Sequence, residues 1–379
     1  MRSSFLLKIL SVITICVILI IVYQILLTTS LFNHVKSSVP IANSVHLGKG
    51  VGKVKVILES EQQQIAKNQN LQNVDTSSLS NDVNVMITFT NAKNNYNLQT
   101  KFKTTVFTMF KWATVPLNVY IIGDEDSQLL ADVVLKETAN THKKEYKVVQ
   151  LDTNDLAKKL NEVIKEMQQY FSYKPGAYYS DALFFLSIAI HKVMPATLHK
   201  VIMMDADLKF NNDIKELFQL FNNFSSTNVI GIARENQPVY RHILSTYRGA
   251  HPGTRVGDPP PNGITGFNSG VLLLNLDKMR KSDVYNSLID SKVVQDLTAK
   301  YSFKGHLGDQ DFFSLLSVEH EELFYILPCT WNRQLCTWWK DKGYESVFDL
   351  YFKCEGHINI YHGNCNTEIP TLDWETNFQ

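Results

Sequence analysis

The chain has 379 residues, with 37 lysines and arginines against 37 aspartates and glutamates, so its formal net charge at pH 7 is zero. This length provides for one large domain or two modest ones. The balanced charge, without a basic cluster of interleaved aromatic residues, sets aside a nucleic-acid partner and a strongly acidic one.

An apolar segment near the N-terminus predicts membrane insertion. Residues 9–27 are dominated by leucine and isoleucine and follow Arg2 and Lys8. The segment is long enough to cross a bilayer, which takes ~20 residues. No small-residue cleavage site follows convincingly, which favours a retained signal anchor over a removed signal peptide. Because the positive charges precede the span, we expect residues 1–8 to form a cytosolic tail and the rest to be translocated.

Two regions follow this span. Residues 28–82 are polar, rich in Ser, Asn and Gln, and lack sustained periodicity, which predicts a stem. Residues 83–379 are expected to form the folded, lumenal part. The whole is then a single-pass type II membrane protein, and a cleaved signal peptide would still place the body in the secretory pathway.

Strands and helices alternate through the folded part. We expect strands at residues 84–91, 117–123, 146–151, 200–207, 229–233, 266–276, 323–327 and 357–361. We expect helices at residues 96–112, 127–141, 156–170, 178–193, 213–221, 282–300 and 312–317. This alternation implies a mostly parallel sheet in an α/β fold, where ligands bind beyond the carboxyl ends of the strands.

The strand at residues 200–207 ends in two aspartates. Four consecutive apolar residues, 201–204, indicate a fully buried strand, and Asp205 and Asp207 follow with only Ala206 between them. If the chain turns there, both carboxylates can share one hard divalent cation, which can neutralise a diphosphate. The competing interpretation is a solvated turn, since Asp is common in turns. The buried strand in front makes the two interpretations equally plausible.

Two other regions are expected to serve ligands. Thr88 to Asn91 end the first strand at the same edge of the sheet as the aspartates, so this strand can supply nucleotide contacts. Residues 234–262 form a long polar loop that includes three consecutive prolines. Loops of this length in compact domains are usually functional or mobile.

The cysteines predict disulfides. Cys16 falls in the predicted membrane span, whereas Cys329, Cys336, Cys354 and Cys365 cluster near the C-terminus. In an oxidising lumen these four form two disulfides, with three possible pairings. Their spacing matches a zinc site poorly. Our hypothesis is that Cys329 pairs with Cys354 and Cys336 with Cys365. These bonds would tie the Trp-rich segment, residues 331–339, to the C-terminal strand predicted at residues 357–361.

Five motifs, in this order, resemble glycosyltransferase family eight, the retaining GT-A enzymes. They are Asp205-Ala206-Asp207, Phe267-Asn268-Ser269-Gly270-Val271, Gly308-Asp309-Gln310-Asp311, Trp331-Asn332 and His362-Gly363. The resemblance covers roughly residues 84–370 and implies a GT-A fold, a Rossmann-like, mostly parallel mixed sheet flanked by helices. The short stem, the Asp-Ala-Asp motif and the Cys- and Trp-rich segment are most similar to the α-1,3-xylosyltransferase branch. Members of that branch transfer xylose from UDP-xylose to xylosyl-glucose O-glycans on epidermal-growth-factor-like (EGF-like) repeats.

The resemblance implies a metal and donor site. Asp205, Asp207 and His362 would bind Mn²⁺, with Mg²⁺ as second choice, and the metal would bridge the donor diphosphate. For His362 the alternative is an ordinary core or surface histidine. Residues implied to contact the UDP-sugar are Thr88, Thr90, Asn91, Ala206, Asn268, Gly270 and His306. For the first three of these the alternative is simply a polar strand end.

The resemblance also places Asp309 and Gln310 beside the anomeric carbon. An amide oxygen is a weak nucleophile, so we expect a front-face route in which Gln310 stabilises an oxocarbenium-like state. The leaving phosphate would then accept the proton of the acceptor hydroxyl. The alternative for both Asp309 and Asp311 is a helix N-cap, and we favour this interpretation for Asp311.

Acceptor contacts are expected from two regions. The candidates are Trp331, Asn332, Trp339, Asn364, His242 and Tyr247. For each tryptophan taken alone, we favour core packing over an acceptor contact. The chain also departs from the family: Asp181 stands where an arginine is usual, and no phosphate-binding lysine follows His362. The diphosphate charge must then rest more heavily on the metal.

Competing functions remain at this stage. One is the same chemistry with UDP-glucose or UDP-galactose, because donor choice depends on space for a C6 hydroxymethyl group. Another is a non-catalytic lumenal glycan-binding protein with the same fold. We expect the protein to lie in the endoplasmic reticulum or Golgi membrane, with its catalytic part in the lumen. The sequence leaves open whether it forms a homodimer.

Overall fold

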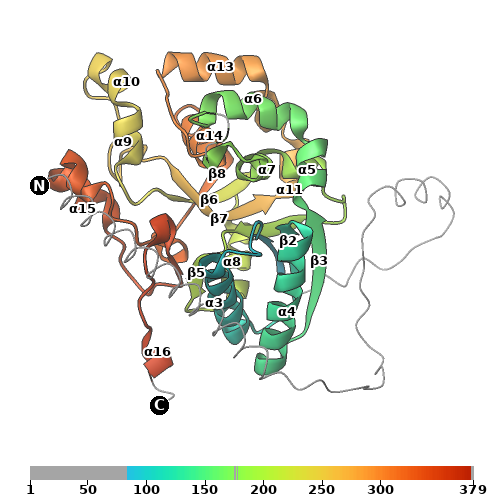
Figure 1. The fold of residues 1–379 in the computed structure, drawn as a ribbon. Helices are drawn as coiled ribbons and strands as arrows, with labels where there is room; N and C mark the ends of the chain where they lie inside the picture. Colours follow the sequence, from blue (N-terminus) through green and yellow to red (C-terminus); the bar gives the residue numbers. More distant parts are fainter. Residues whose placement is uncertain (1–82, 175, 177, 377–379) are drawn as a thin grey trace, which may run out of the picture. The chain divides into compact units, whose positions relative to one another are not determined.

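The computed structural model describes residues 83–174, 176 and 178–376 (Figure 1). The predicted cytosolic tail, membrane span and stem, residues 1–82, lie outside the described residues. Within the described part of the chain, no helix combines the length and the apolar composition that a membrane crossing requires.

A seven-stranded mixed sheet forms the centre of the fold. Its strand order is β3-β2-β1-β4-β7-β6-β8. The bounds are β1 Val83–Thr88, β2 Leu117–Gly123, β3 Tyr146–Asp152, β4 Lys200–Met204, β6 Ile230–Arg234, β7 Phe267–Asn275 and β8 Phe324–Leu327. Strands β3, β2, β1 and β4 are mutually parallel, β7 runs antiparallel to both of its neighbours, and β8 is parallel to β6. The predicted α/β fold with a mostly parallel mixed sheet is therefore confirmed.

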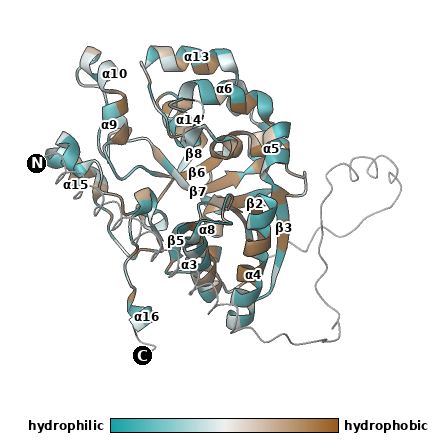
Figure 2. Cartoon of the chain, viewed as in Figure 1, coloured by the Kyte–Doolittle hydropathy of each residue, from teal (hydrophilic) through white to brown (hydrophobic). Residues whose placement is uncertain are grey.

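The register of β4 explains its buried sequence. Ile202 pairs with Val85 of β1 on one side and with Leu273 of β7 on the other, so β4 has no free edge. Both faces are also covered, because Val201 and Ile202 are each fully buried in different hydrophobic clusters. A strand covered in this way needs apolar residues at successive positions. Figure 2 shows β7, which pairs with β4, largely in brown beside helices with teal patches.

Helices cover each face of the sheet. One cluster joins the sheet to α3 Tyr96–Trp112, α4 Glu125–His142 and α8 Ile214–Gln219. The other joins it to α5 Thr153–Lys159, α6 Asn161–Phe171, α7 Leu186–Ala189, α11 Leu276–Lys281, α12 Asp283–Leu288, α13 Ser291–Lys300 and α14 Asp309–Leu316. The same cluster includes Val239 and Tyr240 of α9 Val239–Ile243. The other α-helices of the described residues are α10 Ser245–Ala250, α15 Glu345–Phe352 and α16 Asp373–Thr376.

A second, three-stranded sheet brings the C-terminal part back to the centre. It has the order β5-β10-β9, with β5 Leu208–Phe210, β9 Arg333–Gln334 and β10 Ile360–His362. Strand β10 runs antiparallel to β5 and parallel to β9. In this register His362 lies opposite Leu208, so a residue near the C-terminus comes next to the Asp-Ala-Asp turn.

Three predicted helices are broken in the structure. The expected helix at 178–193 is a series of short turns, because Asp181 accepts a hydrogen bond from the Leu183 N–H (3.0 Å) and starts a new turn. Asp290 likewise accepts from the Lys292 N–H (2.9 Å) and separates α12 from α13. The third, the helix predicted at residues 156–170, is divided at Leu160 into α5 and α6. Short Asp side chains favour such local caps over a continuous helix.

The predicted loop and strand ends also need correction. Residues 234–262 contain α9 and α10 instead of irregular structure only. The strand predicted to continue through Asp207 ends at Met204, and the final strand lies at Ile360–His362 instead of 357–361.

Both predicted disulfides are confirmed. Cys329 is bonded to Cys354 and Cys336 to Cys365. The second bond joins the segment after β9 to the loop after β10. It therefore fixes the loop that follows His362.

Candidate active site

A cavity of about 640 Å³ opens at the edge of the large sheet where β1 and β4 end. Strand β7 runs the opposite way, so its first residues reach the same edge. The predicted site residues that line the cavity are Thr88, Thr90, Asn91, Asp205, Ala206, Asp207, Asn268, Gly270, Asp309, Gln310, Trp339, His362 and Asn364. The carboxyl edge therefore gathers residues from distant parts of the sequence, as open α/β sheets generally do.

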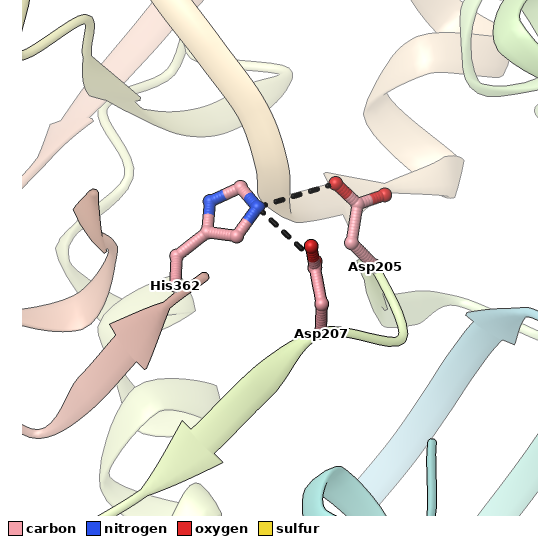
Figure 3. A group of neighbouring side chains, drawn as sticks. All are labelled: Asp205, Asp207 and His362. Carbon is pink, nitrogen blue, oxygen red and sulfur yellow. Dashed lines mark ion pairs between the residues drawn. The ribbon is translucent and has the colours of Figure 1, made fainter. Parts of the chain in front are cut away.

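Asp205 and Asp207 lie on the turn between β4 and β5, and His362 lies at the end of β10 (Figure 3). The imidazole Nε2 is 3.6 Å from Asp205 Oδ2 and 3.3 Å from Asp207 Oδ1. One ligand atom from each of the three residues lies within 4.8 Å of the other two. Two carboxylates and an imidazole are a suitable donor set for Mn²⁺ or Mg²⁺.

Backbone hydrogen bonds hold this turn in place. The Asp205 N–H donates to the Gly270 carbonyl oxygen (3.0 Å), and the Gly363 N–H donates to the Asp207 carbonyl oxygen (2.9 Å). The Thr105 hydroxyl of α3 donates to the carbonyl oxygen of Ala206 (2.9 Å). The turn is thus tied to β7, to the loop after β10 and to α3, which orients both carboxylates.

The histidine is buried and supported from behind. Its Nδ1 lies 3.0 Å from the Asn332 side-chain oxygen, so Nδ1 carries the proton and Nε2 offers its lone pair to a cation. The ring packs against Gly270, where an added Cβ would lie 2.2 Å from the imidazole Cε1. Burial alone would lower the pKa of His362, but the negative charges of Asp207 and Asp205 raise it.

The two aspartates differ in their pKa values. The pKa of Asp205 is raised to about 6, because the cavity walls remove part of its hydration and Asp207 adds repulsion. Its side chain still faces the cavity and is 54% exposed. Burial would raise the pKa of Asp207 as well, but His362 and Lys101 lower it overall. A divalent cation held by Asp205, Asp207 and His362 would need both carboxyl groups in their ionised form.

A polar network surrounds Gln310 on α14. Its side-chain oxygen accepts from the Asn268 amide (3.2 Å) and from the Ser269 N–H (3.4 Å). Its amide nitrogen donates to Glu235 Oε2 (3.4 Å). Glu235 is buried at the end of β6 and also accepts from the Asn268 amide (3.4 Å). These contacts fix the Gln310 side chain at the cavity wall.

Asp309 and Glu235 are buried carboxyl groups of this network. Asp309 accepts from the hydroxyls of Ser187 and Ser269, the latter at 2.9 Å. Burial raises the pKa of Asp309, and the hydrogen bonds from these two hydroxyls lower it. The effect of burial is larger, so the pKa is raised to about 7. Burial likewise raises the pKa of Glu235 to about 7.

The interpretation of Asp311 as an N-cap is wrong. Helix α14 begins at Asp309 and its N-cap is Gly308, at φ +69°. Asp311 is fully buried inside the helix, where it accepts from the Tyr240 hydroxyl (2.9 Å) and the Leu307 N–H (2.6 Å). Burial raises its pKa to about 7. Its role is to join α14 to the α9 region.

The end of β1 is held by Asp124, the N-cap of α4. The Asp124 carboxylate accepts from the Thr90 hydroxyl (2.9 Å) and from the Asn91 N–H (2.5 Å). Burial would raise the pKa of Asp124, but hydrogen bonds from Ser127, Asn91 and Thr90 lower it to about 2. The Thr90 hydroxyl donates its proton to Asp124, so it can offer a ligand in the cavity only its oxygen as a hydrogen-bond acceptor.

The predicted acceptor residues fall into two groups. Trp339 and Asn364 line the cavity, and the ring of His242 lies 4.7 Å from that of Trp339. Asn332 is buried behind His362. Trp331 is buried in the hydrophobic cluster that joins the sheet to α3, α4 and α8, so the core-packing alternative applies to it.

Two further predicted residues are not brought to the cavity. Tyr247 stacks on His251 at 4.0 Å and packs on Tyr301 at 4.7 Å between ring centroids. His306 lies against Tyr173, with ring centroids 6.3 Å apart. Neither lines the cavity.

Sequence reasoning missed several residues of the cavity wall. Glu235 directly follows β6, which runs parallel to β4, so the strand-end argument that found Asp205 also applies to it. Lys101 on α3 carried no motif signal, and its Nζ lies 3.6 Å from Asp207 Oδ2. Tyr178 and Tyr179 also line the cavity.

Comparisons with known proteins agree with this geometry. The family model for glycosyl transferase family 8 matches residues 89–346. Xyloside xylosyltransferase 1 of Mus musculus is 49% identical over 294 residues, 76% of this chain and 75% of that protein. The Homo sapiens protein of the same name is 48% identical over 294 residues, again 76% of this chain and 75% of that protein.

A solved structure supports the same assignment. The crystal structure of mouse xyloside xylosyltransferase 1 in its apo form superposes with a TM-score of 0.72 at 49% identity, covering 76% of this chain and 100% of that chain. The predicted resemblance to the xyloside xylosyltransferase branch is therefore confirmed. The chain belongs to glycosyl transferase family 8 and is a glycosyltransferase with a GT-A-like fold.

Proposed function

We propose that the protein transfers xylose from UDP-xylose to a xylosyl-glucose O-glycan on EGF-like repeats. The product is an α-1,3 linkage formed with retention at the anomeric carbon. The observation that carries the proposal is the cluster of Asp205, Asp207 and His362 in one cavity with Gln310. The similarity over three quarters of the chain to xyloside xylosyltransferase 1 supports the choice of xylose.

Asp205, Asp207 and His362 would hold Mn²⁺, with Mg²⁺ as second choice. When bound, a divalent cation supplies Lewis-acid neutralisation of the diphosphate charge that develops as the sugar departs. The protein's contribution is to keep the three ligand atoms together. Asn332 fixes the imidazole, and the hydrogen bond to the Gly270 carbonyl fixes the Asp205 backbone.

Gln310 is positioned to stabilise charge instead of forming a covalent intermediate. Its side-chain oxygen already accepts from Asn268 and Ser269, and an amide oxygen is a weak nucleophile. In the front-face route, the bond between C1 and the UDP oxygen breaks while the acceptor oxygen forms its bond to C1 from the same side. The departing phosphate takes the proton of the acceptor hydroxyl. Gln310 then faces an oxocarbenium-like centre.

Glu235 offers a rival route through a covalent glycosyl-enzyme. It is a buried carboxyl group of the cavity wall, and its oxygen lies 3.4 Å from the Gln310 nitrogen. Its pKa of about 7 leaves it partly protonated at neutral pH, which weakens it as a nucleophile. Glu235→Gln separates the routes: the front-face route expects a reduced rate, and the covalent route expects turnover to be lost.

The acceptor would enter beside Trp339 and Asn364. Trp339 presents an indole to the cavity, and His242 packs against it. Aromatic faces commonly stack on sugar rings, and a neighbouring amide selects hydroxyl orientation. In this proposal the reaction takes place in the lumen of the endoplasmic reticulum or Golgi, and the predicted signal anchor holds the catalytic part at the membrane.

The experiment incubates the purified full-length chain with Mn²⁺ and each of UDP-xylose, UDP-glucose and UDP-galactose, and measures UDP release. An EGF-like repeat that carries xylosyl-glucose serves as the acceptor. We expect turnover with UDP-xylose and an α-1,3-linked product. Preference for UDP-glucose or UDP-galactose would remove the xylosyl assignment. Glycan binding without turnover of any donor would identify a non-catalytic binding protein.

A further inference from the structure

The wall of the cavity holds many more carboxyl groups than basic side chains. Among the described residues that line it, five carry carboxyl groups: Asp181, Asp205, Asp207, Glu235 and Asp309. Among the same described residues, Lys101 is the one lysine or arginine. A sugar nucleotide brings two further negative charges on its diphosphate. Nearby positive charge on the protein therefore has a strong effect on how well this ligand binds.

Lys101 lies on the face of α3 that is fastened to the Asp-Ala-Asp turn. Thr105, one helical turn further on, donates its hydroxyl proton towards the carbonyl oxygens of Ala206 (2.9 Å) and Leu208 (2.8 Å). The Leu208 N–H donates back to the Thr105 hydroxyl oxygen (2.9 Å). Residues at i and i+4 share a helix face, so this fastening places Lys101 beside the turn.

The ammonium group of Lys101 and the imidazole of His362 face different oxygens of Asp207. Lys101 Nζ lies 3.6 Å from Oδ2, and His362 Nε2 lies 3.3 Å from Oδ1. The lysine side chain is 24% exposed, so it is neither fully buried nor free in solvent. An ammonium group has three N–H donors, and Asp207 can occupy only part of them. Because Lys101 also lines the cavity, its remaining donors can reach a ligand bound there.

We propose that Lys101 binds the diphosphate of the sugar nucleotide next to the cation held by Asp205, Asp207 and His362. This inference rests on the proposed function, since it requires a nucleoside diphosphate in the cavity. Lys101 then supplies from α3 the positive charge that is missing after His362. The competing account is that Lys101 only balances the charge of Asp207.

Calorimetric titration of the full-length protein with UDP, UMP and uridine, at saturating Mn²⁺, tests the proposal. Lys101→Gln should weaken UDP binding about tenfold, which corresponds to ~1.4 kcal/mol. UMP should be affected less, and uridine not at all, because they lack one or both phosphates. Lys101→Arg should retain most of the affinity for UDP. Lys103→Gln is the matched control, because Lys103 lies on the same helix with an exposed side chain.

A second titration, with Mn²⁺ alone, checks that Lys101→Gln leaves the metal site intact, whereas the ratio of UDP to uridine affinity separates the two accounts. If Lys101 binds phosphate, Lys101→Gln should keep or tighten Mn²⁺ binding, because the competing ammonium group is removed. An unchanged ratio of UDP to uridine affinity in Lys101→Gln would overturn the proposal, as would loss of Mn²⁺ binding in that variant. If the wild-type protein shows no Mn²⁺-dependent binding of UDP, the proposed function itself fails. That outcome is visible before any variant is compared.

Discussion

The side-chain oxygen of Asn332 lies 3.0 Å from Nδ1 of His362, while the Asn332 amide donates to the Asn268 side-chain oxygen at 2.9 Å. One buried asparagine therefore joins the group of Asp205, Asp207 and His362 to the polar network around Gln310. The orientation of the imidazole and the orientation of Asn268 depend on the same residue.

Replacing Asn332 should weaken the metal site without removing any ligand. In Asn332→Ala the imidazole loses the acceptor that fixes its tautomer and ring orientation. Changes at such supporting residues typically cost about 10–100-fold in metal affinity. Mn²⁺ titration measures the effect, and Asn222→Ala at an exposed position is the control. Unaltered affinity in Asn332→Ala would show that the ring is held by packing alone.

Gly270 is expected to tolerate no side chain. A Cβ at this position would lie 2.2 Å from Cε1 and 2.7 Å from Nδ1 of His362, so Gly270→Ala must displace the ring. We expect at least about a tenfold loss of Mn²⁺ affinity, because the imidazole leaves its position opposite the carboxylates. Gly249→Ala is the control, since no atom lies within 4 Å of its added Cβ. Normal Mn²⁺ binding by Gly270→Ala would mean that β7 can move away from the histidine.

Asp207→Asn should abolish transfer and leave the fold intact. The substitution keeps the size of the side chain but removes the charge that faces both His362 and Lys101. The measurements are UDP release with UDP-xylose and the circular dichroism spectrum. Asp349→Asn, at a side chain that is 82% exposed, is the matched control. Wild-type turnover by Asp207→Asn would refute the metal site.

The metal-free protein should become more stable as the pH falls from about 8 to about 6. Burial raises the pKa of Glu235, Asp309 and Asp311 to about 7, from 4.5 for Glu235 and 3.8 for each aspartate. In this window the native state binds more protons than the unfolded chain does. The stabilisation is therefore present at low pH and is lost as the pH rises through 7.

Thermal unfolding in EDTA at several pH values measures this dependence. The melting temperature should be higher at pH 6 than at pH 8, and Asp311→Asn should reduce the difference. The opposite slope would show that these carboxyl groups are ionised in the native protein.

The disulfide between Cys336 and Cys365 should support both stability and the metal site. It closes a sequence separation of 29 residues, and Cys365 follows His362 by three positions. Replacing both cysteines by serine should lower the free energy of unfolding by ~3 kcal/mol and weaken Mn²⁺ binding. The control is the double serine variant of Cys329 and Cys354, with a separation of 25 residues. It should lose similar stability but keep its Mn²⁺ affinity, and equal losses of Mn²⁺ affinity would contradict the local role.

The sequence allowed the central parts of the fold and site to be predicted for a physical reason. A strand that is buried on both faces, such as β4, must be apolar at successive positions, and the polar residues after it then mark the ligand-binding edge. Asp205 and Asp207 follow from that rule. His362 and Gln310 did not follow from it, and were found through the resemblance of their motifs.

What could not be predicted depends on local caps and on contacts between distant segments. Asp181 interrupts a helical pattern with a single side-chain hydrogen bond, which hydrophobic periodicity does not register. Lys101 is close to Asp207 only because Thr105 fastens α3 to the turn. Likewise β5 and β10 are three residues each, and their pairing across the sequence gives no short-range signal.

The antiparallel pairing of β10 with β5 also determines when the protein can first work. The chain emerges from the ribosome with Asp205 and Asp207 long before His362, and the imidazole reaches them only when β10 lies on β5. A nascent polypeptide that ends before β10 carries the sheet but lacks the third ligand. Under the proposed function, the cation site is therefore complete only after almost the whole chain has been synthesised.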